Sequence, residues 1–150
     1  MLKYTLVPEE FFEPSEAASL LAQAVQLKES EEVKYQELPA FKAVLVYVPE
    51  GQGRYLIEEM AGRLPQLKDY NKYIVSWDGS CLSAALAAGE RLLLVNSFRA
   101  EDEVTAEYWI FAVLKQFQLN PQVTVVNFLG EVPYRMQNDL ARYFKGVETL

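Results

Sequence analysis

Three short stretches in the first half of the chain have the residue pattern of β-strands. They are residues 2–7, 33–38 and 43–48. In the second stretch, Val33 and Tyr35 alternate with polar neighbours, which predicts a strand with one exposed face. The third stretch is apolar throughout, which predicts a strand covered on both faces, as parallel strands are.

Two further stretches in this half carry apolar residues at helical spacing. Pro14 supplies the fixed φ that suits a first helical position, and a helix is predicted over residues 15–27. A second helix is predicted to end at Pro65, and its apolar stripe consists of Leu56, Met60 and Leu64. Two pairs of opposite charge lie at pairing distance on its surface: Arg54 with Glu58, and Glu59 with Arg63.

The second half of the chain opens with a pattern that predicts three consecutive strands. The alanines and leucines of residues 80–88 favour a helix by propensity, but a crossover between parallel strands needs a dozen or more residues. Asp78 with Gly79, and Gly89 with Glu90, supply turn chemistry at the two ends of this stretch. The predicted strands are therefore 72–77, 81–87 and 91–98.

A long helix with an acidic start follows these strands. Glu101, Asp102 and Glu103 place negative charge where the helix dipole favours it, and Asn120 with Pro121 ends the helix. Its apolar side chains point in most directions, which predicts a helix buried all round. Because one sheet covers one side only, we expect this helix to meet a second lobe, a partner or a second copy.

The remaining residues predict one more strand and one more helix. The strand covers residues 123–129 and ends at Gly130. Pro133 opens the helix, and Gly146 is expected to cap it. The apolar face of this helix consists of Met136, Leu140, Tyr143 and Phe144.

Composition limits the classes of function. With 150 residues, 51% of them hydrophobic, the chain can bury a substantial core, and its formal charge of −7 argues against a nucleic-acid partner. No apolar run approaches the roughly 20 residues that cross a bilayer, and the start lacks a secretion pattern, so we expect a cytoplasmic protein without membrane insertion. The absence of histidine removes triads and metal sites built on that residue.

The remaining chemical candidates have simpler structural explanations. Cys81, the one cysteine, lies in a predicted strand with no histidine to activate it. Two acidic groups could attract a cation, although a solvated turn and a helix start account for them: Glu29, Glu31 and Glu32, and Asp102 with Glu103. Four aromatic residues could form an interaction surface or pack in the core: Tyr70, Tyr73, Trp77 and Trp109. No catalytic residue and no metal ligand is predicted.

The order of three antiparallel strands, helix, strand and helix resembles the repeated subdomain of the actin-like ATPase superfamily, which has a ribonuclease H-like α/β fold. A closer resemblance lies in the stretches 4–8 with Phe11, 46–49, 91–98, 108–117, 118–121 and 128–131. In these stretches the sequence resembles an uncharacterised family from Bacteroidetes with this fold. The members of that family are longer, and this chain resembles their C-terminal portion.

This resemblance implies two lobes and a place for a nucleotide. Residues 1–65 would complete a first lobe and residues 72–146 would form a second, with the polar stretch 66–71 between them. In active relatives, a turn after the first strand of each lobe cradles phosphates with backbone amides. The corresponding turn here holds Asp78, Gly79 and Ser80, and Ser76 stands at the strand end where an acidic residue is expected.

The adenosine motif of such proteins is a glycine pair after the fourth strand. Here Gly130 is followed by the bulky, anionic Glu131. Plain turns explain these positions equally well, so the leading hypothesis is a non-catalytic interaction or scaffold protein without a cofactor, with a protein partner or a homo-oligomer. The alternative is an ATPase or kinase that binds ATP with magnesium through Asp78, Gly79, Ser80 and Gly130.

Overall fold

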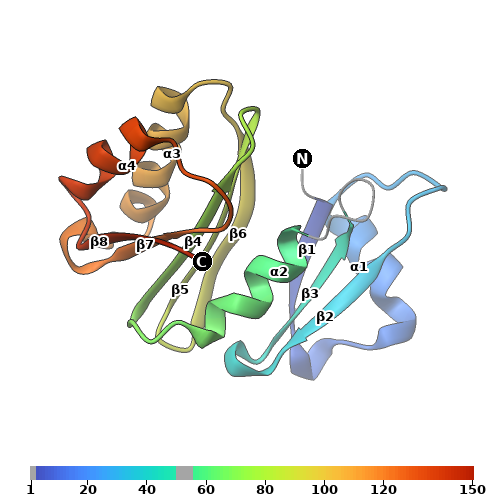
Figure 1. The fold of residues 1–150 in the computed structure, drawn as a ribbon. Helices are drawn as coiled ribbons and strands as arrows, with labels where there is room; N and C mark the ends of the chain where they lie inside the picture. Colours follow the sequence, from blue (N-terminus) through green and yellow to red (C-terminus); the bar gives the residue numbers. More distant parts are fainter. Residues whose placement is uncertain (1–2, 50–55) are drawn as a thin grey trace. The chain divides into compact units, whose positions relative to one another are not determined.

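A computed structural model describes residues 3–49 and 56–150, and the chain divides into two compact units (Figure 1). Unit 1 is Met1–Gly62 and unit 2 is Arg63–Leu150. The division falls near the end of helix α2 (Leu56–Arg63), a few residues before the polar stretch 66–71. That the units are the remainder of a first actin-like lobe and a second lobe stays a prediction. The predicted pair of Arg54 with Glu58 lies outside the described residues.

Unit 1 is built on a three-stranded antiparallel sheet in the order β1-β3-β2. The strands are β1 (Lys3–Pro8), β2 (Lys34–Leu38) and β3 (Ala43–Val48). All three were predicted close to these bounds, and the expectation that residues 43–48 are covered on both faces is confirmed, although β3 pairs antiparallel with both neighbours. Its apolar composition follows from its central place, where Val44 and Val46 face one side and Leu45 and Tyr47 the other, all buried.

Short helices connect and cover this sheet. Helix α1 (Ala17–Ala24) places Leu21 in a core with Val44 and Val46. Pro14 opens a 3-10 turn, Pro14–Glu16, before α1, and α1 ends three residues earlier than predicted. Two further 3-10 turns are Glu9–Phe11 and Pro39–Phe41. Helix α2 passes into a 3-10 turn, Leu64–Gln66, as expected from Pro65, and Met60 and Leu64 of its predicted stripe are buried.

Unit 2 contains a five-stranded mixed sheet in the order β6-β5-β4-β7-β8. The strands are β4 (Asn71–Trp77), β5 (Cys81–Ala88), β6 (Arg91–Arg99), β7 (Val125–Phe128) and β8 (Gly146–Thr149). The first three form an antiparallel meander, and β4–β7 and β7–β8 pair in parallel. Ala88 opposes Arg91 across the turn at Gly89 and Glu90, so the predicted hairpin is confirmed and the helical alternative for 80–88 is excluded.

The expectation that Gly146 caps the last helix is wrong, because Gly146 begins strand β8. Helix α4 (Tyr134–Ala141) ends earlier, and its N-cap is the predicted Pro133. The Lys145 amide then donates to the carbonyl oxygens of Pro121 and Thr124, at 3.0 Å each, which turns the chain back toward β7. A four-residue strand with Val147 as its one β-branched apolar residue carries too short a pattern to be recognised.

The core of unit 2 lies between the sheet and the two helices α3 (Glu103–Gln116) and α4. Figure 1 shows both helices on the same face of the sheet. Alternate residues of the strands point into this core, and the register aligns them: Tyr73, Val75, Leu82, Ala84, Leu86, Val126 and Phe128. The helices contribute Ala106, Ile110, Val113, Leu114, Met136 and Leu140. The buried Tyr73 hydroxyl donates to the Ile110 carbonyl oxygen at 2.8 Å, and burial raises the pKa of this phenol.

Helix α3 is not buried all round, contrary to the expectation from its composition. Val104 and Tyr108 are 71% and 61% exposed. Trp109, in contrast, stacks on Phe98 of β6 with ring centroids 4.4 Å apart. The ring centroids of Phe111 and Phe144 are 5.2 Å apart. The edge of the sheet and the segment after α4 therefore cover a wide arc of α3 within unit 2 itself. Among the described residues, no helix is long and apolar enough to cross a membrane.

Candidate functional site

The predicted nucleotide positions lie at one edge of the unit 2 sheet. Strands β4 and β7 are parallel neighbours, and the Leu129 amide donates to the Val75 carbonyl oxygen at 2.8 Å. The turn at Asp78, Gly79 and Ser80 follows the C-terminal end of β4, and Gly130 follows that of β7. Because β4 and β7 are parallel, their carboxyl ends lie at the same edge of the sheet, and open α/β sheets bind their ligands at such an edge. The topology therefore brings the predicted residues to one sheet edge.

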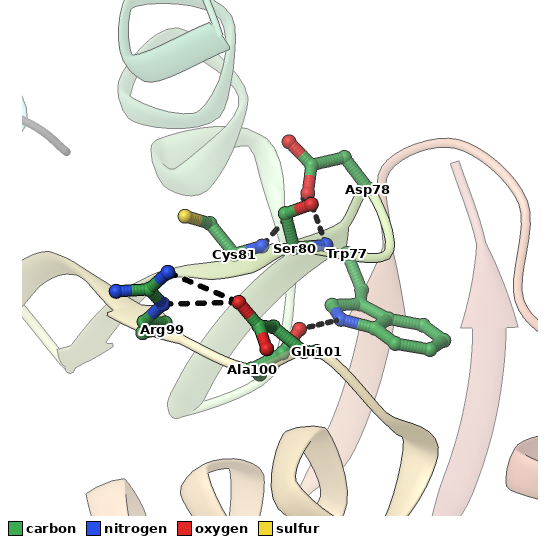
Figure 2. Close-up of polar contacts among 7 residues, drawn as sticks. All are labelled: Trp77, Asp78, Ser80, Cys81, Arg99, Ala100 and Glu101. Carbon is green, nitrogen blue, oxygen red and sulfur yellow. Dashed lines mark hydrogen bonds and ion pairs between the residues drawn. The ribbon is translucent and has the colours of Figure 1, made fainter.

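The Asp78 side chain accepts hydrogen bonds from backbone amides of its own turn, as Figure 2 shows. Its Oδ1 accepts hydrogen bonds from the amides of Ser80 and Cys81, both at 2.8 Å. The Asp78 amide donates to the Cys81 carbonyl oxygen at 3.3 Å, which closes the hairpin between β4 and β5. Asp residues favour such turns because the carboxylate replaces a backbone acceptor. The turn therefore already contains an anionic group bound to two backbone donors.

The segment after β6 fixes this turn from the side. The Trp77 indole donates to the Ala100 carbonyl oxygen at 2.8 Å, and the Ala100 amide donates to the Ser80 carbonyl oxygen at 2.8 Å. Arg99 lies beside the turn in Figure 2, but its guanidinium is paired with Glu101 at 3.1 Å. Arg99, the one basic residue drawn in Figure 2, is therefore already paired with the Glu101 carboxylate.

Both candidate glycines are explained by backbone conformation. Gly79 and Gly130 have φ angles of 91° and 95°, in the region that side chains with a Cβ rarely adopt. A Cβ at either position would meet no atom of the described residues within 4 Å, so close packing against that part of the chain does not require either glycine. Glu131, which follows Gly130, is exposed. Ser76 is buried and pairs across the sheet with Ser83.

The other acidic candidates have structural roles. The Asp102 carboxylate accepts from the Thr105 amide at 2.7 Å, and this hydrogen bond lowers the pKa of Asp102 at the start of α3. Glu31 accepts from the Lys3 ammonium at 2.6 Å and from the Lys28 amide at 2.8 Å. Within residues 3–49 and 56–150, no group of three or more Cys, Asp or Glu side chains is placed to hold a metal ion. Cys81 is a half-buried free thiol.

A carboxyl pair between α3 and α4 was not predicted. Partial burial, followed by repulsion from Asp139, raises the pKa of Glu107 to about 7. This pKa includes a smaller upward contribution from Glu103 and a downward one from Arg135. The Glu107 Oε1 atom is buried and finds no hydrogen-bond partner among residues 3–49 and 56–150. Because 32 residues separate Glu107 from Asp139 in the chain, no local sequence signal identifies the pair.

An apolar surface groove along the C-terminal half of α3 was also not predicted. We call it the α3 groove; it has a volume of about 780 Å³. Its lining consists of Tyr108, Phe111, Ala112, Leu114, Lys115, Gln118, Leu119 and Pro121. Gln118, with a left-handed φ of 57°, turns the chain after α3, and the Leu119 amide returns to the Leu114 carbonyl oxygen at 3.0 Å. The groove falls within the 300–1,000 Å³ usual for ligand-sized hollows.

Comparison with known proteins agrees with the resemblance seen in the sequence. The model of a family described as "Protein of unknown function (DUF3822)" matches residues 2–60 and 50–147. A crystal structure from Bacteroides thetaiotaomicron, described as a protein with actin-like ATPase fold and unknown function, superposes with a TM-score of 0.73 at 22% identity. The match covers 99% of this chain and 65% of that one, and confirms the fold. No curated protein matches the chain.

Proposed function

We propose that this chain, which belongs to the DUF3822 family, is a non-catalytic interaction protein built on the actin-like ATPase fold. The observation that carries the proposal is that the Asp78 carboxylate accepts hydrogen bonds from the Ser80 and Cys81 amides. These are the donors that a nucleotide phosphate would need in this turn.

A phosphate would have to displace the carboxylate before it could bind there. The displacement gives up two charge-assisted hydrogen bonds, each worth about 1 kcal/mol or more. The freed carboxylate would also lie close to the phosphate, and two like charges 4 Å apart repel by about 1 kcal/mol even in bulk water. Together these costs, of order 3 kcal/mol, lower the affinity for a phosphate by about a hundredfold.

Exposed apolar side chains on unit 2 support the interaction role. They gather on α3, α4 and the segments that follow these helices: Val104, Tyr108, Val123, Tyr134 and Tyr143. Each is at least 57% exposed. Tyrosines supply large contact areas with little loss of conformational freedom, and they are enriched in the cores of protein interfaces. The α3 groove adds a concave, apolar element to the same unit.

The second candidate is a nucleotide-binding ATPase or kinase that uses ATP with magnesium. It is favoured by the convergence of Asp78, Gly79, Ser80 and Gly130 on one sheet edge. The fold of the structural neighbour supports the same reading, although this chain spans 65% of that protein. An intact site would need the Asp78 carboxylate to swing away from the two amides.

Calorimetry and thermal unfolding with magnesium and ATP separate the two candidates. The proposal predicts no saturable heat and no rise in Tm for the wild-type chain. A ligand at ten times its Kd adds about 1.4 kcal/mol, which raises the Tm of a protein of this size by several degrees. A saturable heat with such a rise would overturn the non-catalytic proposal.

Asp78→Ala tests whether the carboxylate is what keeps phosphate out. Because this variant frees two amides and removes one negative charge, it should bind magnesium–ATP more tightly than the wild type does. Exposed Glu90→Ala, in the other hairpin turn, is the matched control for the loss of one charge. Equal affinities of Asp78→Ala and wild type would refute the occlusion argument.

A further inference from the structure

The α3 groove has a basic rim on a chain that is acidic overall. Residues 111–124, which include every lining residue except Tyr108, and residues 140–147 contain three basic side chains and no acidic one; Glu107 precedes Tyr108 and Asp139 precedes Leu140. Lys115 lines the groove, Lys145 lies beside it through its hydrogen bond to Pro121, and Arg142 precedes Tyr143, whose ring contacts Phe111 at 5.5 Å. All three basic side chains are exposed.

Lys115 is available for an anionic partner. Among residues 3–49 and 56–150, its ammonium group has no carboxylate within ion-pair distance. The ring of Tyr108 and the apolar side chains of Leu114 and Leu119 line the same groove. The groove thus offers an apolar floor with positive charge at its rim, which matches a ligand with an aromatic group flanked by carboxylates.

Unit 1 carries a segment with that chemistry. Residues 8–16 hold four glutamates and no basic residue, with Phe11 and Phe12 in the middle. Phe12 packs against Tyr35, with ring centroids 5.0 Å apart, but Phe11 is 69% exposed. Both Glu9 and Glu10, immediately before Phe11, are exposed as well.

The backbone holds this segment in a defined shape. A 3-10 turn, Glu9–Phe11, is closed by the Phe12 amide, which donates to the Glu9 carbonyl oxygen at 3.3 Å. The Glu9 amide donates to the Lys42 carbonyl oxygen at 3.1 Å, which ties the turn to the end of β3. Such preorganisation reduces the entropy lost when the segment binds.

We propose that the α3 groove binds the Phe11 segment, residues 9–13, of a second copy of this chain. The proposal rests on the interaction role described above and names the partner for that role. The Phe11 ring fills the groove, and Glu10 and Glu13 face the basic rim. At physiological ionic strength the Debye length is about 8 Å, so the rim attracts the segment although both copies carry a net negative charge.

The proposed contact is heterologous, because two different surfaces meet. Each copy has one groove and one Phe11 segment, so copies associate head to tail, and they form rings or open chains. A single aromatic anchor with a short segment lies at the small end of protein interfaces. We therefore expect a Kd in the micromolar range or weaker.

Sedimentation measurements on the full chain, at protein concentrations from about 1 μM to 1 mM, cover the range in which a micromolar or weaker Kd can be measured. We expect the weight-average mass of the wild type to rise with concentration. Phe11→Ser and Lys115→Glu should each weaken association about tenfold or more, because one removes the anchor and the other reverses the rim charge. Lys68→Glu, at an exposed residue of unit 2 outside the groove lining, is the matched control for the charge reversal.

Mixing the two defective variants tests the geometry directly. Phe11→Ser retains an intact groove, and Lys115→Glu retains an intact Phe11 segment. A head-to-tail contact predicts that the mixture forms 1:1 dimers with the wild-type pair affinity and grows no further. Circular dichroism checks that both variants are folded, which their exposed positions favour.

Three results would overturn the proposed contact: a wild type that stays monomeric throughout, variants that associate like wild type, or a mixture no better than its components. None of these decides whether the chain binds nucleotide, which calorimetry with magnesium–ATP measures separately. A nucleotide-binding chain that still shows the complementation would overturn the non-catalytic proposal and leave the contact standing.

Discussion

The Glu107–Asp139 pair makes the stability of unit 2 depend on pH, and Glu107→Gln should remove most of that dependence. Glu107 has a folded-state pKa of about 7, against an ordinary value of 4.5. The native state therefore holds the proton more tightly than the unfolded state does. As the pH rises from about 4.5 to about 7, the free energy of unfolding should fall, and above that window the loss is complete.

The magnitude follows from the shift after a discount for solvent. A shift of about 2.5 pH units corresponds to at most about 3.4 kcal/mol, at 1.36 kcal/mol per unit. Glu107 is only partly buried, so screening by water reduces this to about 1 kcal/mol. Glutamine keeps the size of the side chain, carries no charge, and can donate a hydrogen bond to Asp139. We expect Glu107→Gln to be about 1 kcal/mol more stable than wild type at pH 8 and equal to it at pH 4.

Urea unfolding at a series of pH values, followed by tryptophan fluorescence, measures this difference. Both tryptophans of the chain, Trp77 and Trp109, lie in unit 2, so the signal reports on the unit that contains the pair. Glu90→Gln, at an exposed turn of the same unit, is the control and should leave the pH profile unchanged. A Glu107→Gln variant that equals wild type at pH 8, or gains more stability in acid, would refute the reasoning.

Substitutions at three further positions test the local structure of unit 2 by thermal unfolding. Asp102→Ala should lower the Tm, because the Thr105 amide loses its cap, and Asp102→Asn should recover most of that loss. Gly79→Ala should cost about 1–2 kcal/mol, since alanine is strained at a φ of 91°, and no loss would contradict that geometry. Trp109→Ala should cost about 3 kcal/mol through lost stacking on Phe98, whereas Trp109→Phe should cost clearly less.

The meander of unit 2 was predictable because its signals are local. The alanine-rich stretch 80–88 was identified as a strand because too few residues lie between the flanking strands for a helical crossover. The turn residues at both of its ends then fixed the hairpins. The antiparallel setting of β3 was not predictable, because a central strand in an antiparallel sheet and a strand in a parallel sheet are both apolar.

The candidate site was predictable in position but not in its internal bonding. The dipeptide Asp78-Gly79 indicated a turn, and the strand order placed Gly130 on the same sheet edge. Whether the carboxylate points outward or into its own amides depends on side-chain rotamers, which the sequence does not encode locally. The α3 groove and the Glu107–Asp139 pair arise where separate segments pack, so periodicity along one segment carries no sign of them.

The short strand β8 shields one side of the unit 2 sheet, where it covers β7, from open-ended pairing with other molecules. It hydrogen-bonds to β7, whose residues Val126 and Phe128 are fully buried. On the outer side of the sheet, β8 presents the exposed Glu148 and Thr149 instead. If the chain were cut after Lys145, an almost entirely apolar strand would become the free edge, a template for intermolecular β-pairing and aggregation.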